Sequence, residues 1–144
     1  MIGTVDVIDS CVLPIQAEDD VVRVRTRVRD LAQRLGFDAF AVAAISTAAS
    51  ELTRNTWVHG GGGRSVVEEV VQDGRPGLRL AFHDTGPGIA DVERVLRGGF
   101  STRRSLGLGL SGARRLVDDF VIESAPGVGT NVVVTKWARF GSRA

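Results

Sequence analysis

The stretch between residues 38 and 59 constrains the fold more than any other part of the sequence. It reads "DAFAVAAISTAASELTRNTWVH", opens with Asp38 as a good N-cap, and is followed by a run of glycines that ends a helix. The helix is rich in alanine and apolar around much of its circumference, which is typical of a helix buried in the interior. We therefore predict that it packs against a sheet.

Strand patterns lie on both sides of this helix. A first strand, at 4–15, is rich in β-branched residues and carries Pro14, which favours a place near a sheet edge. Two further segments flank an Asp-Gly turn and predict a β-hairpin. The strands after the first are expected at 64–72, 77–84, 120–126 and 130–137.

Three other segments have helical patterns. Apolar residues recur at three- and four-residue steps over 18–35, a short helix is expected over 90–97, and a last helix over 110–120, after an irregular loop at 98–109. The first of these helices carries Arg23, Arg25, Arg27, Arg29 and Arg34. This basic face is either a solvated helix surface or a docking surface for an acidic protein, and the pattern leaves both open.

Composition narrows the classes of partner. The 144 residues are 43% hydrophobic, which suits one domain over 1–144 with a real core. Lys and Arg number 18 against 17 Asp and Glu, so charge gives no case for nucleic-acid or membrane binding. The only cysteine, Cys11, has no disulfide partner, and no targeting or membrane-spanning segment is evident. We expect a cytoplasmic protein.

Polar residues late in the apolar helix predict a chemical site. Glu51, Asn55 and His59 are four residues apart, so they stack along one helix face. An Asn carbonyl is a hard oxygen ligand for a divalent cation, and a carboxylate can accept a hydroxyl proton. His59, beside the glycines, is expected to cap or pack rather than to catalyse.

Two glycine-rich motifs add a phosphate-binding character. "DTGPG" at 84–88 follows a strand, and "GLGLSG" at 107–112 follows a basic loop and is expected to open a helix. Glycines allow backbone N–H groups to approach an anion, and a helix N-terminus favours phosphate. Neither a Rossmann fingerprint nor a P-loop is present, so the pattern indicates a magnesium nucleotide held in another way.

The order "ELTRN", "DTGPG", "GLGL" and "GVGT" closely resembles the four sequence boxes of the GHKL ATPase and kinase superfamily. The resemblance implies the Bergerat fold, a two-layer α/β sandwich with a mixed, mostly antiparallel sheet covered by helices on one face. It also implies that ATP and Mg²⁺ bind. The roles it implies are Asn55 on Mg²⁺, Asp84 on the adenine amine, Gly86 and Gly88 shaping the base pocket, Gly107, Leu108 and Gly109 along the phosphates, and Thr130 on the adenine side.

Within the superfamily, the chain is most similar to the small bacterial anti-sigma factors and serine kinases, particularly the RsbT-type switch kinases of stress signalling. That similarity implies a serine/threonine-protein kinase in which Glu51 is the general base and the substrate is a STAS-domain antagonist. A sigma factor or a downstream phosphatase is the further partner it implies. An anti-sigma factor acting by sequestration and a non-catalytic nucleotide-dependent adaptor are the alternatives.

The loop at 98–108 is expected to act as a lid that becomes ordered when ATP binds, because glycines flank its basic stretch. Arg103 and Arg104 in this loop are candidates for phosphate or substrate contacts, or are simply solvated. Trp57 and Trp137 are expected in the core or an interface.

Overall fold

The computed structural model describes residues 3–97 and 104–139. Its strands and helices follow one another in the order β1 (Asp6–Ile15), α1 (Asp20–Arg34), α2 (Ala39–Val58), β2 (Gly63–Gln72), β3 (Arg75–Asp84), α3 (Val92–Leu96), α4 (Arg104–Leu116), β4 (Asp119–Ala125) and β5 (Gly129–Trp137).

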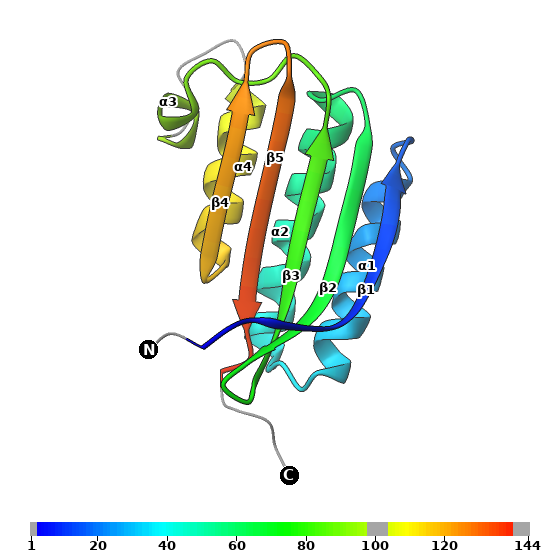
Figure 1. The fold of residues 1–144 in the computed structure, drawn as a ribbon. Coiled ribbons are helices and arrows are strands. Elements are labelled where there is room, and N and C mark those ends of the chain that lie inside the picture. The colour runs from blue at the N-terminus through cyan, green and yellow to red at the C-terminus, as the bar shows by residue number, and fades with distance from the viewer. Residues whose placement is uncertain (1–2, 98–103, 140–144) are drawn as a thin grey trace.

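The five strands form one sheet in the order β1-β2-β3-β5-β4, and helices α1, α2 and α4 cover one of its faces (Figure 1). All four pairings between the described strands are antiparallel, whereas the resemblance implies a mixed, mostly antiparallel sheet. The two-layer α/β sandwich is confirmed, and β1 lies at a sheet edge, as Pro14 predicts.

The core lies between the sheet and the helices. Side chains of alternate strand residues, such as Val67, Leu80 and Val134, are fully buried beneath α2, whose Ala48 and Leu52 are also buried. The alternation explains why the strands have one apolar side, and the small alanines explain how α2 lies so close to the sheet. The apolar helix predicted at 38–59 is therefore the central element of the core.

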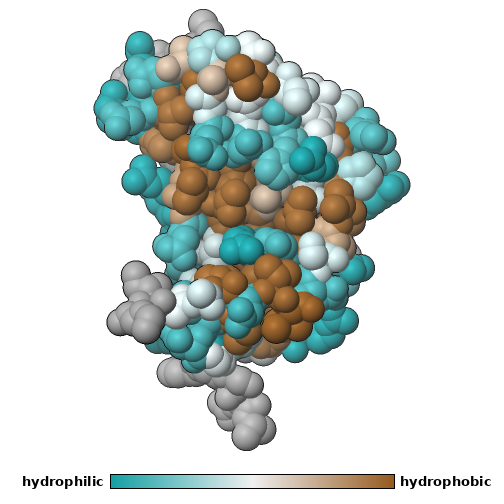
Figure 2. All heavy atoms as spheres, viewed as in Figure 1, coloured by the Kyte–Doolittle hydropathy of each residue, from teal (hydrophilic) through white to brown (hydrophobic). Residues whose placement is uncertain are grey.

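The uncovered face of the sheet also carries an apolar row. The register pairs Val12 with Val66, Val66 with Ala81, Ala81 with Val133, and Val133 with Val121. Figure 2 shows brown, hydrophobic side chains in a band across the middle of this face, with polar residues above and below. Val12 and Val121 are exposed.

The predicted local signals for the turns and caps are present. The side chain of Asp38 accepts a hydrogen bond from the Ala41 N–H at 2.8 Å, which caps α2. Asp73 and Gly74 both have positive φ, as the two-residue hairpin turn between β2 and β3 requires.

One helix begins earlier than the sequence predicts. Helix α4 starts at Arg104, so Gly107, Leu108 and Gly109 lie within it rather than at its N-terminus. Arginine, serine and leucine are compatible with a helix, and isolated glycines weaken one without ending it. The expectation that "GLGL" opens a helix is therefore wrong in this structure.

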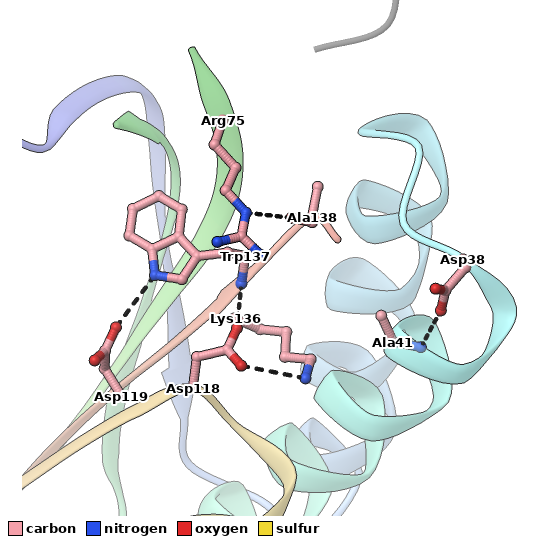
Figure 3. Close-up of polar contacts among 8 residues, drawn as sticks. All are labelled: Asp38, Ala41, Arg75, Asp118, Asp119, Lys136, Trp137 and Ala138. Atoms are coloured by element: carbon pink, nitrogen blue, oxygen red, sulfur yellow. Dashed lines mark hydrogen bonds and ion pairs between the residues drawn. The ribbon is translucent and has the colours of Figure 1, made fainter. Parts of the chain in front are cut away.

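Side-chain hydrogen bonds link neighbouring segments at the end of the sheet where β3 begins (Figure 3). Asp118 accepts from the Trp137 N–H at 2.7 Å and pairs with Lys136 at 3.5 Å. The Trp137 indole donates to Asp119 at 3.2 Å, and Arg75 donates to the Ala138 carbonyl. Trp137 also packs on Gly77, so it is a structural residue, as predicted.

Among the described residues, no helix is both long and apolar enough to span a bilayer.

Candidate functional site

A pocket lies at the opposite end of the sheet, where β3 ends and α2 reaches its C-terminus. Four residues predicted from three motifs line it together: Asn55 from α2, Asp84 from the end of β3, Gly88 from the loop after β3, and Thr130 from β5. The apolar part of the lining includes Leu52, Phe82, Ile89, Leu110 and Val132. Polar groups converging on an apolar pocket are typical of a small-molecule site.

The pocket is narrow in this structure, with a volume of about 20 Å³. Sites that hold drug-sized ligands are usually roughly 300–1,000 Å³. A flat base therefore enters only when the lining side chains move apart.

The Asp84 carboxylate is held in a fixed orientation. Its Oδ1 accepts from the Gly86 N–H at 3.0 Å, and its Oδ2 lies directly over Gly60, where an added Cβ would come within 2.5 Å of it. One oxygen is thus used by the loop while the carboxylate still lines the pocket. Such a group can accept a hydrogen bond from an exocyclic amine.

Gly86 and Gly88 are required by close backbone approach. A Cβ on Gly86 would lie 2.6 Å from the Gly60 carbonyl oxygen, and one on Gly88, whose φ is +74°, would lie 2.0 Å from the carbonyl oxygen of Ala125. The "DTGPG" loop is therefore clamped between the end of α2 and the β4–β5 turn. The sequence predicts that these glycines let the chain bend. The structure shows in addition that they let the backbones of the loop, the end of α2 and the β4–β5 turn pack closely together.

Asn55 has unused hydrogen-bonding capacity. Its Nδ2 atom is buried and has no hydrogen-bond partner among the described residues. Its amide packs against Gly109 of α4, where an added Cβ would lie 2.9 Å from both amide heteroatoms. Buried polar atoms are nearly always paired, so the Nδ2 of Asn55 is available to donate to a ligand atom or a water.

Glu51 lies one turn before Asn55 and lines a separate groove between α2 and α4. Its carboxylate accepts from Arg54 Nη1 at 3.1 Å, and its side chain is 37% exposed. Asn55 and His59 line both the groove and the pocket, so the two adjoin each other. The predicted base therefore lies beside the pocket rather than inside it.

Sequence reasoning missed Ser124 of β4. Its hydroxyl accepts from the Ile89 N–H at 2.8 Å, donates to the Gly129 carbonyl at 3.0 Å, and lies 2.8 Å from Thr130 Oγ1. Ser124 thus connects the loop after β3 to β5 and orients Thr130. A serine in an alternating strand gives no signal of such a role.

Several predicted residues receive a partial description. Gly107 and Leu108 lie in the first turns of α4, and Gly109 contacts Asn55. Arg103 and most of the proposed lid, 98–103, lie outside the described residues. His59 is the C-cap of α2 and its N–H donates to the Asn55 carbonyl, as the capping prediction expects.

The donor set fits a magnesium nucleotide better than a metal alone. The described residues contain no group of three or more His, Cys, Asp or Glu side chains that could hold a metal. Mg²⁺ commonly takes one or two protein ligands and completes its shell with phosphates and water. Asn55 could hold the cation through its Oδ1, whereas its unpaired Nδ2 is a donor and suits a phosphate oxygen.

Comparison with known proteins shows the family of the chain. Residues 14–136 match the family model of the histidine kinase-like ATPase domain. The chain is 43% identical to the serine/threonine-protein kinase RsbT of Bacillus subtilis over 130 residues, which is 90% of this chain and 97% of that protein. It is 30% identical to the anti-sigma F factor of Thermoanaerobacter sp. over 78% of this chain and 82% of that protein.

Solved structures agree on the fold. The RsbU and RsbW domains of Rv1364c from Mycobacterium tuberculosis superpose with a TM-score of 0.61 at 21% identity, over 94% of this chain and 34% of that one. The histidine kinase domain of Erythrobacter litoralis EL346 gives 0.50 at 20% identity, over 85% of this chain and 60% of that one. The chain therefore belongs to the histidine kinase-like ATPase family, in the group that contains the serine/threonine-protein kinase RsbT.

Proposed function

We propose that this protein is an ATP-dependent serine/threonine-protein kinase that phosphorylates a STAS-domain antagonist in a bacterial sigma-factor or stress-regulatory pathway. The observation that carries the proposal is the convergence of Asp84 and Asn55 on one pocket, with Glu51 in the groove that adjoins it. The identity to RsbT over nearly the whole of both chains supports the kinase activity. The proposal includes one domain over 1–144 and a cytoplasmic location.

The residues suggest a division of work. Asp84 accepts from the adenine amine, and Thr130, held by Ser124, completes the polar edge of the base pocket. Asn55 would hold Mg²⁺, which supplies charge neutralisation on the phosphates when it is bound. Gly107, Leu108 and Gly109 are proposed to lie along the phosphates.

Transfer of the γ-phosphoryl group needs a base for the hydroxyl proton and alignment of the hydroxyl oxygen with the γ-phosphorus. The partner's Ser or Thr oxygen attacks the γ-phosphorus in line, the bond to the β,γ-bridging oxygen breaks, and ADP leaves. Glu51 accepts the hydroxyl proton, and the hydrogen bond from Arg54 engages only its Oε1. Most of the catalytic effect then comes from positioning.

A second candidate function is an anti-sigma factor that acts by sequestration. The identity to the anti-sigma F factor over 78% of this chain favours it, and the exposed arginines of α1 offer a basic surface. A sigma factor or a downstream phosphatase would be the bound partner. A nucleotide-dependent adaptor explains the pocket but leaves Glu51 without a role.

The test is phosphoryl transfer to the STAS-domain proteins of the same organism, using labelled ATP and Mg²⁺. We expect one of them to be labelled on Ser or Thr, and Glu51→Gln to lower the rate by about 10²- to 10⁴-fold with ATP affinity unchanged. Unlabelled STAS proteins despite ATP binding, together with capture of a sigma factor, would favour sequestration instead. Equal rates for the wild type and Glu51→Gln would remove Glu51 as the base.

A further inference from the structure

A second pocket lies at the end of the sheet where β3 begins, next to the N-terminus of α2. Its lining includes Phe40 from α2, Arg75 from β3 and Lys136 from β5, and we call it the α2 N-terminal pocket. None of the described residues lines both this pocket and the nucleotide pocket. Helix α2 has 20 residues, which is about 30 Å of helix, and the nucleotide pocket lies at its other end. A molecule in the α2 N-terminal pocket therefore leaves the nucleotide pocket accessible.

Phe40 is an exposed aromatic residue that the fold does not explain. It is 81% exposed, more than any other large hydrophobic residue in the described part of the chain. It lies outside the core cluster, and phenylalanine is a poorer helix former than alanine. Covering such a ring removes a large apolar surface from water, and aromatic residues are enriched at protein interfaces. The ring is therefore better explained by a partner than by the folding of α2.

The charges around Phe40 favour a partner of negative charge. The pocket is lined by three cations, Arg75, Lys136 and Arg139, and by two carboxylates, Asp38 and Asp118. Both carboxylates are engaged within the fold, since one caps α2 and the other accepts from a backbone N–H and pairs with Lys136. The Nε of Arg75 donates to a backbone carbonyl, while its Nη1 and Nη2 have no hydrogen-bond partner among the described residues. A guanidinium with two unused nitrogens is complementary to a carboxylate.

We propose that the α2 N-terminal pocket binds an acidic segment of a partner protein. An Asp or Glu side chain of that segment pairs with Arg75, and a neighbouring apolar side chain packs on Phe40. The pocket has a volume of about 270 Å³, below the roughly 300–1,000 Å³ typical of small-molecule sites, so it suits one or two protein side chains. The interaction lies apart from the nucleotide pocket, so it goes beyond the proposed kinase function and does not depend on it.

The probe is a set of short synthetic peptides that each contain one Glu and one Leu, adjacent or separated by a few Gly and Ser residues. Matched sets carry Lys or Gln in place of Glu. Binding to the full chain is measured by calorimetry, with and without Mg·ATP. We expect at least one Glu peptide to bind with a Kd below about 1 mM, and its Lys and Gln counterparts to bind about 10-fold or more weakly. Mg·ATP should change the Kd less than twofold.

Two substitutions locate the binding surface. Phe40→Ser should weaken binding of the Glu peptide by about 10-fold or more, because it removes the apolar contact. Arg75→Glu should reverse the preference, so that the Lys peptide binds more tightly than the Glu peptide. Val22→Ser, which also removes an exposed apolar side chain, and Arg27→Glu, which makes the same change of charge, are the matched controls on α1. Both controls should bind the Glu peptide as the wild type does.

ATP affinity serves as the check on folding, and every variant should keep it within twofold. If Arg75→Glu loses ATP binding together with its contact to the backbone carbonyl, Phe40→Ser decides. The proposal is overturned if no Glu peptide binds the wild type, if Lys and Glu peptides bind equally, or if Phe40→Ser binds normally. It is also overturned if light scattering shows a dimer that Phe40→Ser dissociates, since the occupant would then be a second copy of the chain.

Discussion

The two ends of the sheet are closed in different ways. Where β3 begins, side chains link the strands: Asp118 accepts from the Trp137 backbone N–H and pairs with Lys136, and Asp119 accepts from the Trp137 indole (Figure 3). Where β3 ends, Asp84 and Ser124 accept from the loop, glycine backbones pack closely, and the Nδ2 of Asn55 has no partner among the described residues.

The difference separates structural polar residues from functional ones. At the first end, the carboxylates are used within the fold, so the structure itself explains them. At the second end, the Nδ2 of Asn55 is buried and has no hydrogen-bond partner among the described residues. Burying an unpaired donor costs free energy of folding, and no contact within the described part of the fold offsets that cost.

The largest effect is expected where the glycine contacts are closest. Gly88→Ala would place a Cβ 2.0 Å from the Ala125 carbonyl oxygen at a φ of +74°, so we expect a loss of about 3 kcal/mol or more in the free energy of unfolding. Gly127→Ala is the matched control, because its φ is +76° and no atom of the described residues lies within 4 Å of the added Cβ. Its loss should be about 1 kcal/mol. Urea denaturation measures both, and equal losses would show that the clamp is unimportant.

An intermediate effect is expected at Ser124, which connects the loop to β5. Ser124→Ala removes the acceptor of the Ile89 N–H and the partner of Thr130, so we expect a loss of about 1–2 kcal/mol in stability and weaker ATP binding. Ser10→Ala, at an exposed position of β1, should change neither. If ATP affinity is unchanged in Ser124→Ala, the hydroxyl network does not shape the base pocket.

The smallest effect is expected at the other end. Asp118→Ala removes one acceptor and a partly exposed ion pair, so we expect a loss of about 1 kcal/mol in stability, read from thermal or urea unfolding. ATP affinity should stay within twofold by calorimetry. A larger change in affinity would mean that the two ends are coupled.

Much of this arrangement could be predicted from local signals. The N-cap Asp38, the Asp73-Gly74 turn and the edge strand with Pro14 each depend on neighbours in the sequence, and the structure confirms them. The spacing of Glu51, Asn55 and His59 likewise predicted that they would share a region, and all three line the α2–α4 groove.

Other features depend on contacts between distant segments. The roles of Ser124 and Gly60 arise only when β4 and the end of α2 come up against the loop after β3. The placement of β5 between β3 and β4 is likewise a long-range pairing. The start of α4 differs from the prediction because Gly107 and Gly109 lie inside the helix, which glycines weaken without ending.

The most direct test of the account is ATP binding by Asp84→Asn, measured by calorimetry beside the wild type and Asp118→Ala. Asp84 uses one oxygen for the Gly86 N–H, and an asparagine would leave an amide donor facing either that N–H or the adenine amine. We predict an affinity about 10- to 100-fold lower with stability nearly unchanged, and a normal affinity in Asp118→Ala. Wild-type ATP affinity in Asp84→Asn would contradict the assignment of this end of the sheet as the nucleotide site.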